Sequence, residues 1–130
     1  MHKGTAANYK TDTITAYRKA LEERERRRRA ERERRRREAL AAVRQAVCAV
    51  APSYPTLERV YLYGSVIRPG AFRRDSDVDV AVEGLDAGEC FDLWRDLEQA
   101  APAWKLDVRP LKSDDHFSDR VRQRGVIIYG

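Results

Sequence analysis

Residues Tyr61–Val82 read YLYGSVIRPGAFRRDSDVDVAV, and this stretch decides the fold. It predicts an apolar strand, a turn at Gly64 and Ser65, and a second strand that carries Asp77 and Asp79. Side chains two positions apart on a strand lie on the same face, so these two carboxylates are expected to lie close together. Like charges at that distance repel unless a cation lies between them, and oxygen ligands of this kind suit Mg2+. The stretch therefore predicts a metal-dependent site that handles phosphate.

The Gly-Ser turn separates this interpretation from a simpler one, in which the Asp-x-Asp is only a solvated turn at a strand end. Gly64 allows close approach of the backbone, and the N–H groups that follow it can bind a phosphate together with the Ser65 hydroxyl. Both features face one predicted cleft, which favours the phosphate site. The loop between them also carries Arg68, Arg73 and Arg74.

Length and composition limit the class of protein. The chain has 130 residues, the size of one domain. It contains no run of 18 apolar residues that would predict a membrane span, and its N-terminus, MHKGTAANYK, lacks the apolar segment of a secretion signal. Cys48 and Cys90 have no metal-type spacing, so we expect both to be small buried side chains. Together these features favour a reduced, cytoplasmic protein.

Charge is distributed unevenly along the chain. The formal net charge is +5, but residues 1–45 hold 15 Lys and Arg against 7 Asp and Glu, whereas residues 46–130 hold 11 against 14. We expect residues 1–12 to form a frayed tail and residues 13–50 to form a long helix, because the second range contains no glycine or proline. Its middle, EERERRRRAERERRRRE, is charged on every face, and acids four positions before arginines stabilise such a helix.

Three interpretations of the charged helix stay open: a solvated helix without a partner, an arm that docks on a partner, and an arm that binds nucleic acid. Arginine clusters attract phosphate, but no aromatic residue interleaves with them and the glutamates dilute the positive field. The charged part has no apolar seam, which argues against a coiled coil. Apolar residues return in the last turns, at Leu40, Val43, Val47 and Val50, so we expect this third of the helix to pack on the domain.

Residues 51–130 alternate between strands and helices. The expected strands are Leu57–Tyr63, Asp75–Glu83, Lys105–Leu111 and Val126–Tyr129. The expected helices are Ala87–Ala101, capped by Asp86, and Asp114–Arg124, capped by Ser113. The apolar stripe of the first of these helices consists of Phe91, Trp94, Leu97 and Cys90. This alternation predicts the α/β class without fixing whether the strands pair parallel or antiparallel.

A third acid, Asp107, lies on an expected strand between apolar neighbours, where a lone carboxylate would be costly to bury. Either it pairs with Arg109 or Lys105 at the strand end, or its strand lies beside that of Asp79. In the second arrangement three acids can hold two divalent ions, which stabilise the attacking and leaving oxygens of a displacement at phosphorus. Asp107 would then also help to deprotonate the incoming hydroxyl.

The residues that carry this chemistry match a known motif. The run Gly64-Ser65-x-x-Arg68 … Ser76-Asp77-x-Asp79 resembles the GSxxRG…SDxDL signature of minimal nucleotidyltransferases, within the polymerase-beta-like nucleotidyltransferase superfamily. Asp107, in KLDVRPL, matches the third acid of the family on a later strand. The resemblance covers about residues 57–130 and implies the nucleotidyltransferase fold, an α/β (α+β) fold with a small mixed sheet flanked by helices, here as a domain of residues 51–130. The long charged N-terminal helix is an addition, and Pro69 interrupts the usual Arg-Gly pair.

This resemblance implies a role for each motif residue. The nucleotide-binding residues would be Gly64, Ser65, Arg68 and Ser76, and the catalytic and metal-binding residues would be Asp77, Asp79 and Asp107. Two Mg2+ ions would be bound, and AMP would pass from ATP, the substrate, to a hydroxyl with release of pyrophosphate. Arg73 and Arg74 stay open between phosphate binding and an ordinary exposed loop.

The chain has no room for a domain that recognises the acceptor, so we expect the acceptor to be a separate protein or a neighbour in a homo-oligomer. Stand-alone members of the nucleotidyltransferase superfamily resemble the antitoxins of HEPN/MNT toxin–antitoxin pairs. In these pairs the nucleotidyltransferase adenylylates its HEPN partner, commonly on tyrosine. The leading hypothesis is therefore an antitoxin that acts on a HEPN-type toxin. Two alternatives stay open: a non-catalytic antitoxin scaffold that neutralises a toxin by binding, and a nucleotidyltransferase that uses the basic helix to modify nucleic acid such as tRNA.

Overall fold

The computed structural model describes residues 5–130, with side chains from Lys10 onward. The chain divides into two compact units, one up to Glu31 and one from Arg32 to Gly130. Helix α1 (Thr5–Val50) begins in the first unit and ends in the second. It begins at Thr5 rather than at residue 13, because no glycine or proline interrupts the sequence between Gly4 and Pro52. Residues 1–4 of the expected frayed tail lie outside the described residues.

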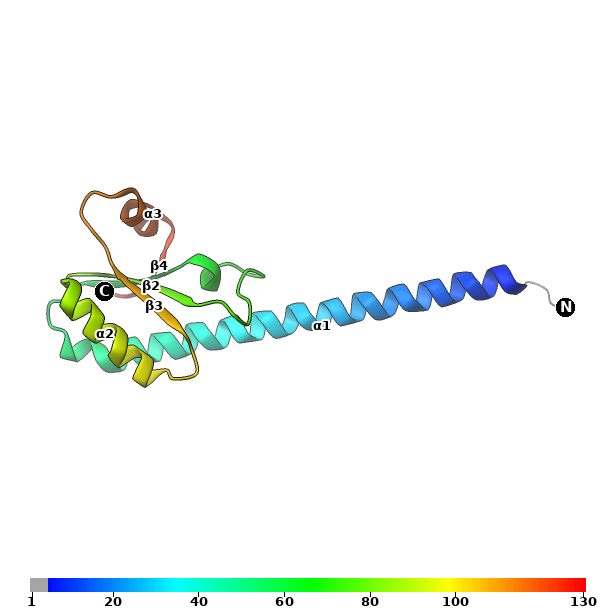
Figure 1. Ribbon diagram of the computed structural model, residues 1–130, viewed down its shortest axis with the longest axis horizontal. Helices are drawn as coiled ribbons and strands as arrows, with labels where there is room; N and C mark the ends of the chain where they lie inside the picture. The colour runs from blue at the N-terminus through cyan, green and yellow to red at the C-terminus, as the bar shows by residue number, and fades with distance from the viewer. Residues whose placement is uncertain (1–4) are drawn as a thin grey trace. The chain divides into compact units, whose positions relative to one another are not determined.

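A four-stranded mixed sheet forms the centre of the second unit (Figure 1). Its strands are β1 (Arg59–Tyr63), β2 (Val78–Glu83), β3 (Leu106–Pro110) and β4 (Val126–Tyr129), and their order in the sheet is β3-β2-β1-β4. β1 pairs antiparallel with β2 and with β4, whereas β2 pairs parallel with β3. Helix α2 (Ala87–Ala100) connects the parallel pair. The predicted α/β class and small mixed sheet are confirmed.

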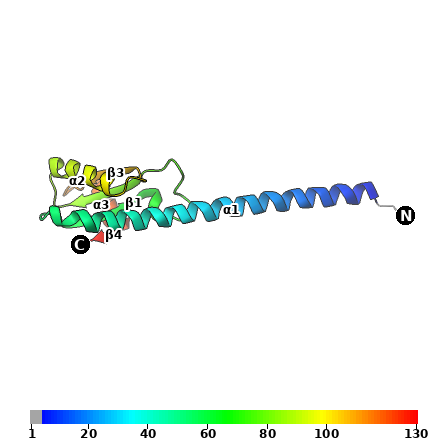
Figure 2. The same cartoon turned by 90° about the horizontal axis from the view of Figure 1, so that it is seen from below.

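The two faces of the sheet are covered differently. On one face, α2 and the last turns of α1 enclose the main core (Figures 1 and 2). The sheet side chains of this core are Val60, Leu62, Val78, Val80, Val82, Leu106 and Val108. The opposite face is covered by α3 (His116–Arg124), whose Val121 packs on Tyr61 and Ala81. Because strand side chains alternate, Asp79 and Asp107 lie on this second face.

The last turns of α1 pack as the sequence predicted. Val43 and Val47 are buried, and Leu40 and Val50 lie partly buried against the same core. The prediction that both cysteines are buried is right for Cys90 and wrong for Cys48, which is exposed. Cys48 follows Val47 directly, so on a helix its side chain points about 100° away from the packed stripe.

Helix α2 is capped as predicted, because the Asp86 carboxylate accepts from the N–H of Glu89 and the Glu89 carboxylate accepts from the N–H of Asp86. Its predicted stripe is partly wrong: Phe91 is 62% exposed. The buried residues of the helix are Cys90, Leu93 and Leu97. These follow the i, i+3, i+7 spacing that places side chains on one face, and Phe91 falls outside it.

Helix α3 begins at His116, two residues later than predicted, and its cap is Asp115 rather than Ser113. The Asp115 carboxylate accepts from the N–H of Ser118 at 2.7 Å, which satisfies a donor of the first turn. The first three strands are also shorter than predicted, and β2 begins at Val78, so Asp77 precedes it. No helix in the described part of the chain is long and apolar enough to cross a membrane.

Candidate active site

The Gly64–Ser65 turn lies directly against the Asp79 carboxylate. Tyr63, the last residue of β1, pairs in register with Asp79 of β2, and Gly64 begins the short 3-10 helix η2 (Gly64–Ile67). The φ angle of Gly64 is +76°, and a Cβ atom at this position would overlap Oδ2 of Asp79. Both the backbone angle and the space therefore require glycine here. The sequence predicted that this turn and the acidic strand meet, and the structure brings them into contact.

Asp79 and Asp107 are neighbours on parallel strands. They are direct partners in the β2–β3 register, so both side chains leave the sheet on the face of α3. Burial raises the pKa of the Asp79 carboxyl above its ordinary value, and the negative charges of Asp107 and Asp77 raise it further, while Arg109 opposes them. The three predicted acids are thus close enough to influence one another.

Asp77 is positioned by a turn rather than by the strand. The Ser76 hydroxyl accepts a hydrogen bond from the N–H of Arg73 at 2.9 Å, and the N–H of Ser76 donates to the Arg73 carbonyl at 3.0 Å. This turn delivers Asp77 to the start of β2, where one carboxylate oxygen lies 3.9 Å from Nζ of Lys105. The Ser76 hydroxyl therefore has a structural partner, and its binding of nucleotide stays a prediction.

The structure shows both arrangements that the sequence left open for Asp107, because its strand lies beside that of Asp79 and its carboxylate also pairs with Arg109. Nη2 of Arg109 lies 3.1 Å from Oδ2 of Asp107. Within residues 10–130, no three His, Cys, Asp or Glu side chains are gathered closely enough to hold a metal ion as they stand. Two of the three acids instead have a basic partner, Asp77 with Lys105 and Asp107 with Arg109.

The residues nevertheless fit a divalent cation. All the donors at this centre are carboxylate oxygens, the ligands that Mg2+ prefers. The basic side chains that would compete with a metal ion for these acids are exposed, 80% for Lys105 and 57% for Arg109. Exposed ion pairs contribute little to stability, so a metal ion can replace them. A cation beside Asp79 would also relieve the repulsion that raises its pKa. Asp77, Asp79 and Asp107 are therefore the residues that would hold Mg2+.

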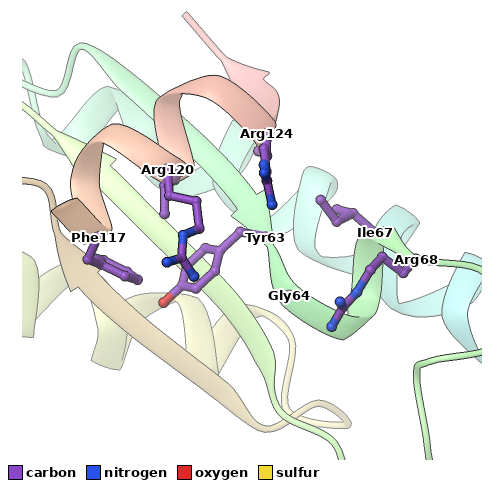
Figure 3. Close-up of a pocket in the computed structure, with 9 residues that line it drawn as sticks. Tyr63, Gly64, Ile67, Arg68, Phe117, Arg120 and Arg124 are labelled. Carbon is purple, nitrogen blue, oxygen red and sulfur yellow. The ribbon is translucent and has the colours of Figure 1, made fainter.

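A pocket of about 370 Å³ opens beside the turn, between η2 and α3 (Figure 3). Its lining residues are Tyr63, Gly64, Ile67, Arg68, Phe117, Arg120, Val121, Arg124 and Gly125. Gly64 and Arg68 were predicted from the motif, whereas the contribution of α3 was not. The last turn of α3 is basic, with Arg122 and Arg124, which also suits the negative end of the helix dipole. Arg120 and Arg124 lie four residues apart, which places both on one side of the helix.

Tyr63 and Phe117 form the aromatic part of the pocket lining, and Tyr63 lies near enough to Asp79 and Asp107 to be affected by their charge. The rings of Tyr63 and Phe117 meet edge to face, with centroids 5.4 Å apart. Burial raises the pKa of Tyr63 to about 12, and the charge of Asp79 adds to the effect of burial. The Tyr63 phenol therefore keeps its proton at neutral pH and can donate a hydrogen bond.

Arginines of the charged helix hold η2 and the loop that follows it in place. Arg36, whose side chain is only 13% exposed, donates from Nη1 to the Val66 carbonyl of η2 at 3.0 Å. Arg35 donates from Nη2 to the Arg74 carbonyl at 3.3 Å, and its guanidinium carbon lies 4.8 Å from the centre of the Trp104 ring. These arginines are internal supports of the site, a role that the sequence interpretations did not include. The side chains of Arg73 and Arg74 are exposed, and their role stays a prediction.

The polymerase beta nucleotidyltransferase family matches residues 45–130, which include the three acids, the Gly64–Ser65 turn and the pocket. The chain belongs to this family. It is therefore a nucleotidyltransferase, as the motif implied, and the family match begins within α1, ahead of the resemblance seen in the sequence.

Solved structures share the fold of this nucleotidyltransferase. A mutant form of the toxin–antitoxin MntA-HepT matches with a TM-score of 0.56 and 24% identity, over 68% of this chain and 73% of that chain. The toxin–antitoxin MntA-HepT matches with a TM-score of 0.51 and 22% identity, over 70% and 72%. A tri-AMPylated Shewanella oneidensis HEPN toxin in complex with MNT antitoxin matches with a TM-score of 0.50 and 22% identity, over 70% and 71%. At these identities the likeness confirms the nucleotidyltransferase fold. No curated protein is significantly similar to the chain in sequence.

Proposed function

We propose that this nucleotidyltransferase transfers AMP from ATP to a hydroxyl of a HEPN-type toxin and thereby acts as its antitoxin. The observation that carries the proposal is the arrangement of Asp79, which is in register with Asp107 on one side and in contact with Gly64 on the other. One residue thus joins the acids that suit a metal ion to the turn that suits a phosphate.

The reaction is a displacement at the α-phosphorus of ATP. The oxygen of the acceptor hydroxyl forms a bond to this phosphorus, the bond from the phosphorus to the oxygen bridging to the β-phosphate breaks, and pyrophosphate leaves. The proton of the hydroxyl passes to the Asp107 carboxylate. Two Mg2+ ions, held by Asp77, Asp79 and Asp107, would neutralise phosphate charge and make the hydroxyl more acidic.

The backbone at Gly64 and Ser65 and the side chain of Arg68 are the proposed contacts to the phosphates. No side chain accepts a capping hydrogen bond from the first N–H groups of the turn, so these donors can bind a phosphate. Arg68 extends into the neighbouring pocket, and it makes no ion pair with a carboxylate among residues 10–130.

A HEPN-type toxin is the proposed acceptor, with tyrosine as the proposed target and the cytoplasm as the location. A tri-AMPylated HEPN toxin in complex with MNT antitoxin has the same fold on its antitoxin side, which supports the proposal.

Co-expression with the product of the neighbouring gene, which the proposal expects to be a HEPN-type protein, tests the proposal. The partner should gain the mass of one or more AMP groups, and peptide mapping should place them on tyrosine. The double variant Asp77→Asn/Asp79→Asn should bind the partner but leave it unmodified and toxic. If that variant neutralises the partner fully and no AMP is added by the wild type, the chain is a non-catalytic scaffold.

A further inference from the structure

Three large apolar side chains lie exposed on one face of α1. Ile14 is 56% exposed, Tyr17 66% and Leu21 45%. Their spacing of three and then four residues places them on a single stripe along the helix. Neither hydrophobic cluster formed by the described residues includes any of them. The stripe also lies outside residues 45–130, which the nucleotidyltransferase family matches, so packing of that domain does not explain it.

Support of the helix itself does not require this stripe. A tyrosine four residues before a leucine can stabilise a helix locally. Residues 22–38 are nevertheless helical with a single apolar residue, Ala30. Isoleucine and tyrosine are also weaker helix formers than the alanine, arginine and glutamate of that segment. Scattered exposed apolar side chains need no explanation, but a contiguous stripe bordered by charges is typical of an interaction surface.

Basic residues continue the stripe at both ends. The same spacing of three and four residues reaches Lys10 on one side, and Arg24 and Arg28 on the other, and all three are exposed. At about 100° per residue, Glu25 is the only acid among residues 10–28 on this side of the helix. The face is therefore apolar in its middle and positively charged at its ends.

This charge pattern selects the occupant of the stripe. Parallel pairing with a second copy of the chain would place Arg24 and Arg28 beside their own counterparts, and antiparallel pairing would place Lys10 beside Arg24. Like charges in such contacts oppose association. A nucleic acid would attract the bases, but its phosphates would leave Ile14 and Leu21 without an apolar surface to cover them. A helix with an apolar stripe and acids at its ends fits both parts of the face.

Resting on the proposed function, we propose that the α1 stripe, defined as Ile14, Tyr17 and Leu21, docks an acidic amphipathic helix of the toxin partner. The stripe contributes no residue to the carboxylate centre or to the Gly64–Ser65 turn. Because α1 is one helix from Thr5 to Val50, a partner held at the stripe is tethered to the transferase domain. Such a second attachment raises the affinity for the acceptor and leaves the chemical step unchanged.

Binding and transfer assays with the full chain and the product of the neighbouring gene test this surface. The stripe variant Ile14→Gln/Tyr17→Gln/Leu21→Gln removes the apolar side chains and substitutes a good helix former. It should bind the partner at least tenfold more weakly in isothermal titration, and KM for the partner should rise by a similar factor. Its kcat and its KM for ATP should stay within twofold of the wild type.

A matched pair of variants tests the charges beside the stripe. Lys10→Gln/Arg28→Gln and Lys19→Gln/Arg26→Gln each remove two positive charges from exposed side chains. Lys19 and Arg26 lie on the opposite side of the helix from the stripe. The first variant should weaken partner binding at least threefold, and the second less than twofold. Equal weakening in both would contradict recognition of this face.

Other occupants would be revealed by the same variants. Unchanged partner affinity in the stripe variant would overturn the docking surface. A wild-type dimer that the stripe variant dissociates in analytical ultracentrifugation would assign the stripe to a second copy. Binding of poly(U) RNA that the stripe variant weakens, with partner binding unchanged, would assign it to nucleic acid.

Photocrosslinking decides the matter if circular dichroism shows that the stripe variant has lost helix. Benzoylphenylalanine in place of Tyr17 should form a crosslink to an acid-flanked helix of the partner, and in place of Lys19 it should not. No crosslink from position 17, or equal crosslinks from both positions, would overturn the proposal.

Failure of this inference can be distinguished from failure of the proposed function. If the partner receives AMP and binds the stripe variant as tightly as the wild type, the docking surface is wrong and the transferase stands. If the partner binds with the predicted dependence on the stripe but receives no AMP, the docking surface stands and the proposed reaction is wrong. If the wild type does not bind the partner at all, both are wrong.

Discussion

The Asp79 carboxylate occupies the space that a side chain at Gly64 would need. This contact joins the predicted phosphate turn to the predicted metal ligands, and it explains why the turn begins with glycine. It also makes the turn sensitive to the smallest substitution.

Gly64→Ala should abolish transfer and destabilise the fold. Alanine at a φ of +76° costs about 1–2 kcal/mol, and displacement of Asp79 adds to this cost. Gly70→Ala is the matched control, since Gly70 has a φ of +82° but a Cβ atom added there would meet no atom within 4 Å. It should lose stability by the backbone cost alone and keep its activity. Urea unfolding and transfer assays of both variants measure this difference, and equal activity losses would contradict the account.

Arg36→Gln should destabilise the fold and raise KM for ATP, although Arg36 is not one of the proposed contacts to the nucleotide. Arg36 donates to the Val66 carbonyl within the loop, and loss of such a charged hydrogen bond costs about 1.5–3 kcal/mol. The loop is then less well fixed, so KM for ATP should rise as well. Arg37→Gln removes the same charge and an ion pair to the same acid, Glu33, but the Arg37 side chain is 75% exposed. Its stability should change by less than about 0.5 kcal/mol. The comparison fails if both variants have the same melting temperature and KM.

Asp79→Asn should stabilise the protein at neutral pH in the absence of divalent ions. Burial, Asp107 and Asp77 raise the pKa of Asp79 in the folded state, so ionisation of this carboxyl is easier in the unfolded chain. The folded state is therefore favoured below the unfolded pKa, and this advantage is lost as pH rises through the folded pKa. The gain from Asn should accordingly be largest at neutral pH and disappear in acid.

Thermal melts between pH 3 and pH 8, with EDTA and with MgCl2, measure this prediction. Mg2+ should raise the melting temperature of the wild type above that of Asp79→Asn, whose own melting temperature should change little. A variant that melts below the wild type at pH 7 in EDTA would contradict the assigned repulsion.

The sequence predicted the parts of the fold that depend on local pattern. The alternation around Val78, Val80 and Asp79 correctly assigned the two faces of β2, because a period of two leaves little freedom. The Gly-Ser and Asp-x-Asp motifs also predicted that the turn and the acidic strand lie together, which the contact of Gly64 with the Asp79 carboxylate confirms. The apolar stripes of the helices were predicted less reliably. Phe91 was wrongly assigned to the buried side of α2, because a shift of one residue along a helix turns the side chain by about 100°.

The missed features are those in which distant segments meet. Arg36 and Val66 are 30 residues apart, and nothing in the charge pattern distinguishes Arg36 from its exposed neighbour Arg37. Arg120 and Arg124 lie on a helix whose position over the sheet follows from the pairing of β4 with β1. The sequence left open whether Asp107 forms an ion pair or lies beside Asp79, because both arrangements suit an acid on that strand, and the structure shows both.

Transfer of label from two forms of ATP tests the central claim most directly. The chain would be incubated with MgCl2, its HEPN-type partner and ATP labelled at either the α- or the γ-phosphate, beside the Asp77→Asn/Asp79→Asn variant. The account predicts that α-label alone becomes attached to the partner, that labelled pyrophosphate is released from the γ-labelled form, and that the variant does neither. Attachment of γ-label, or α-label transfer by the variant at the wild-type rate, would contradict it.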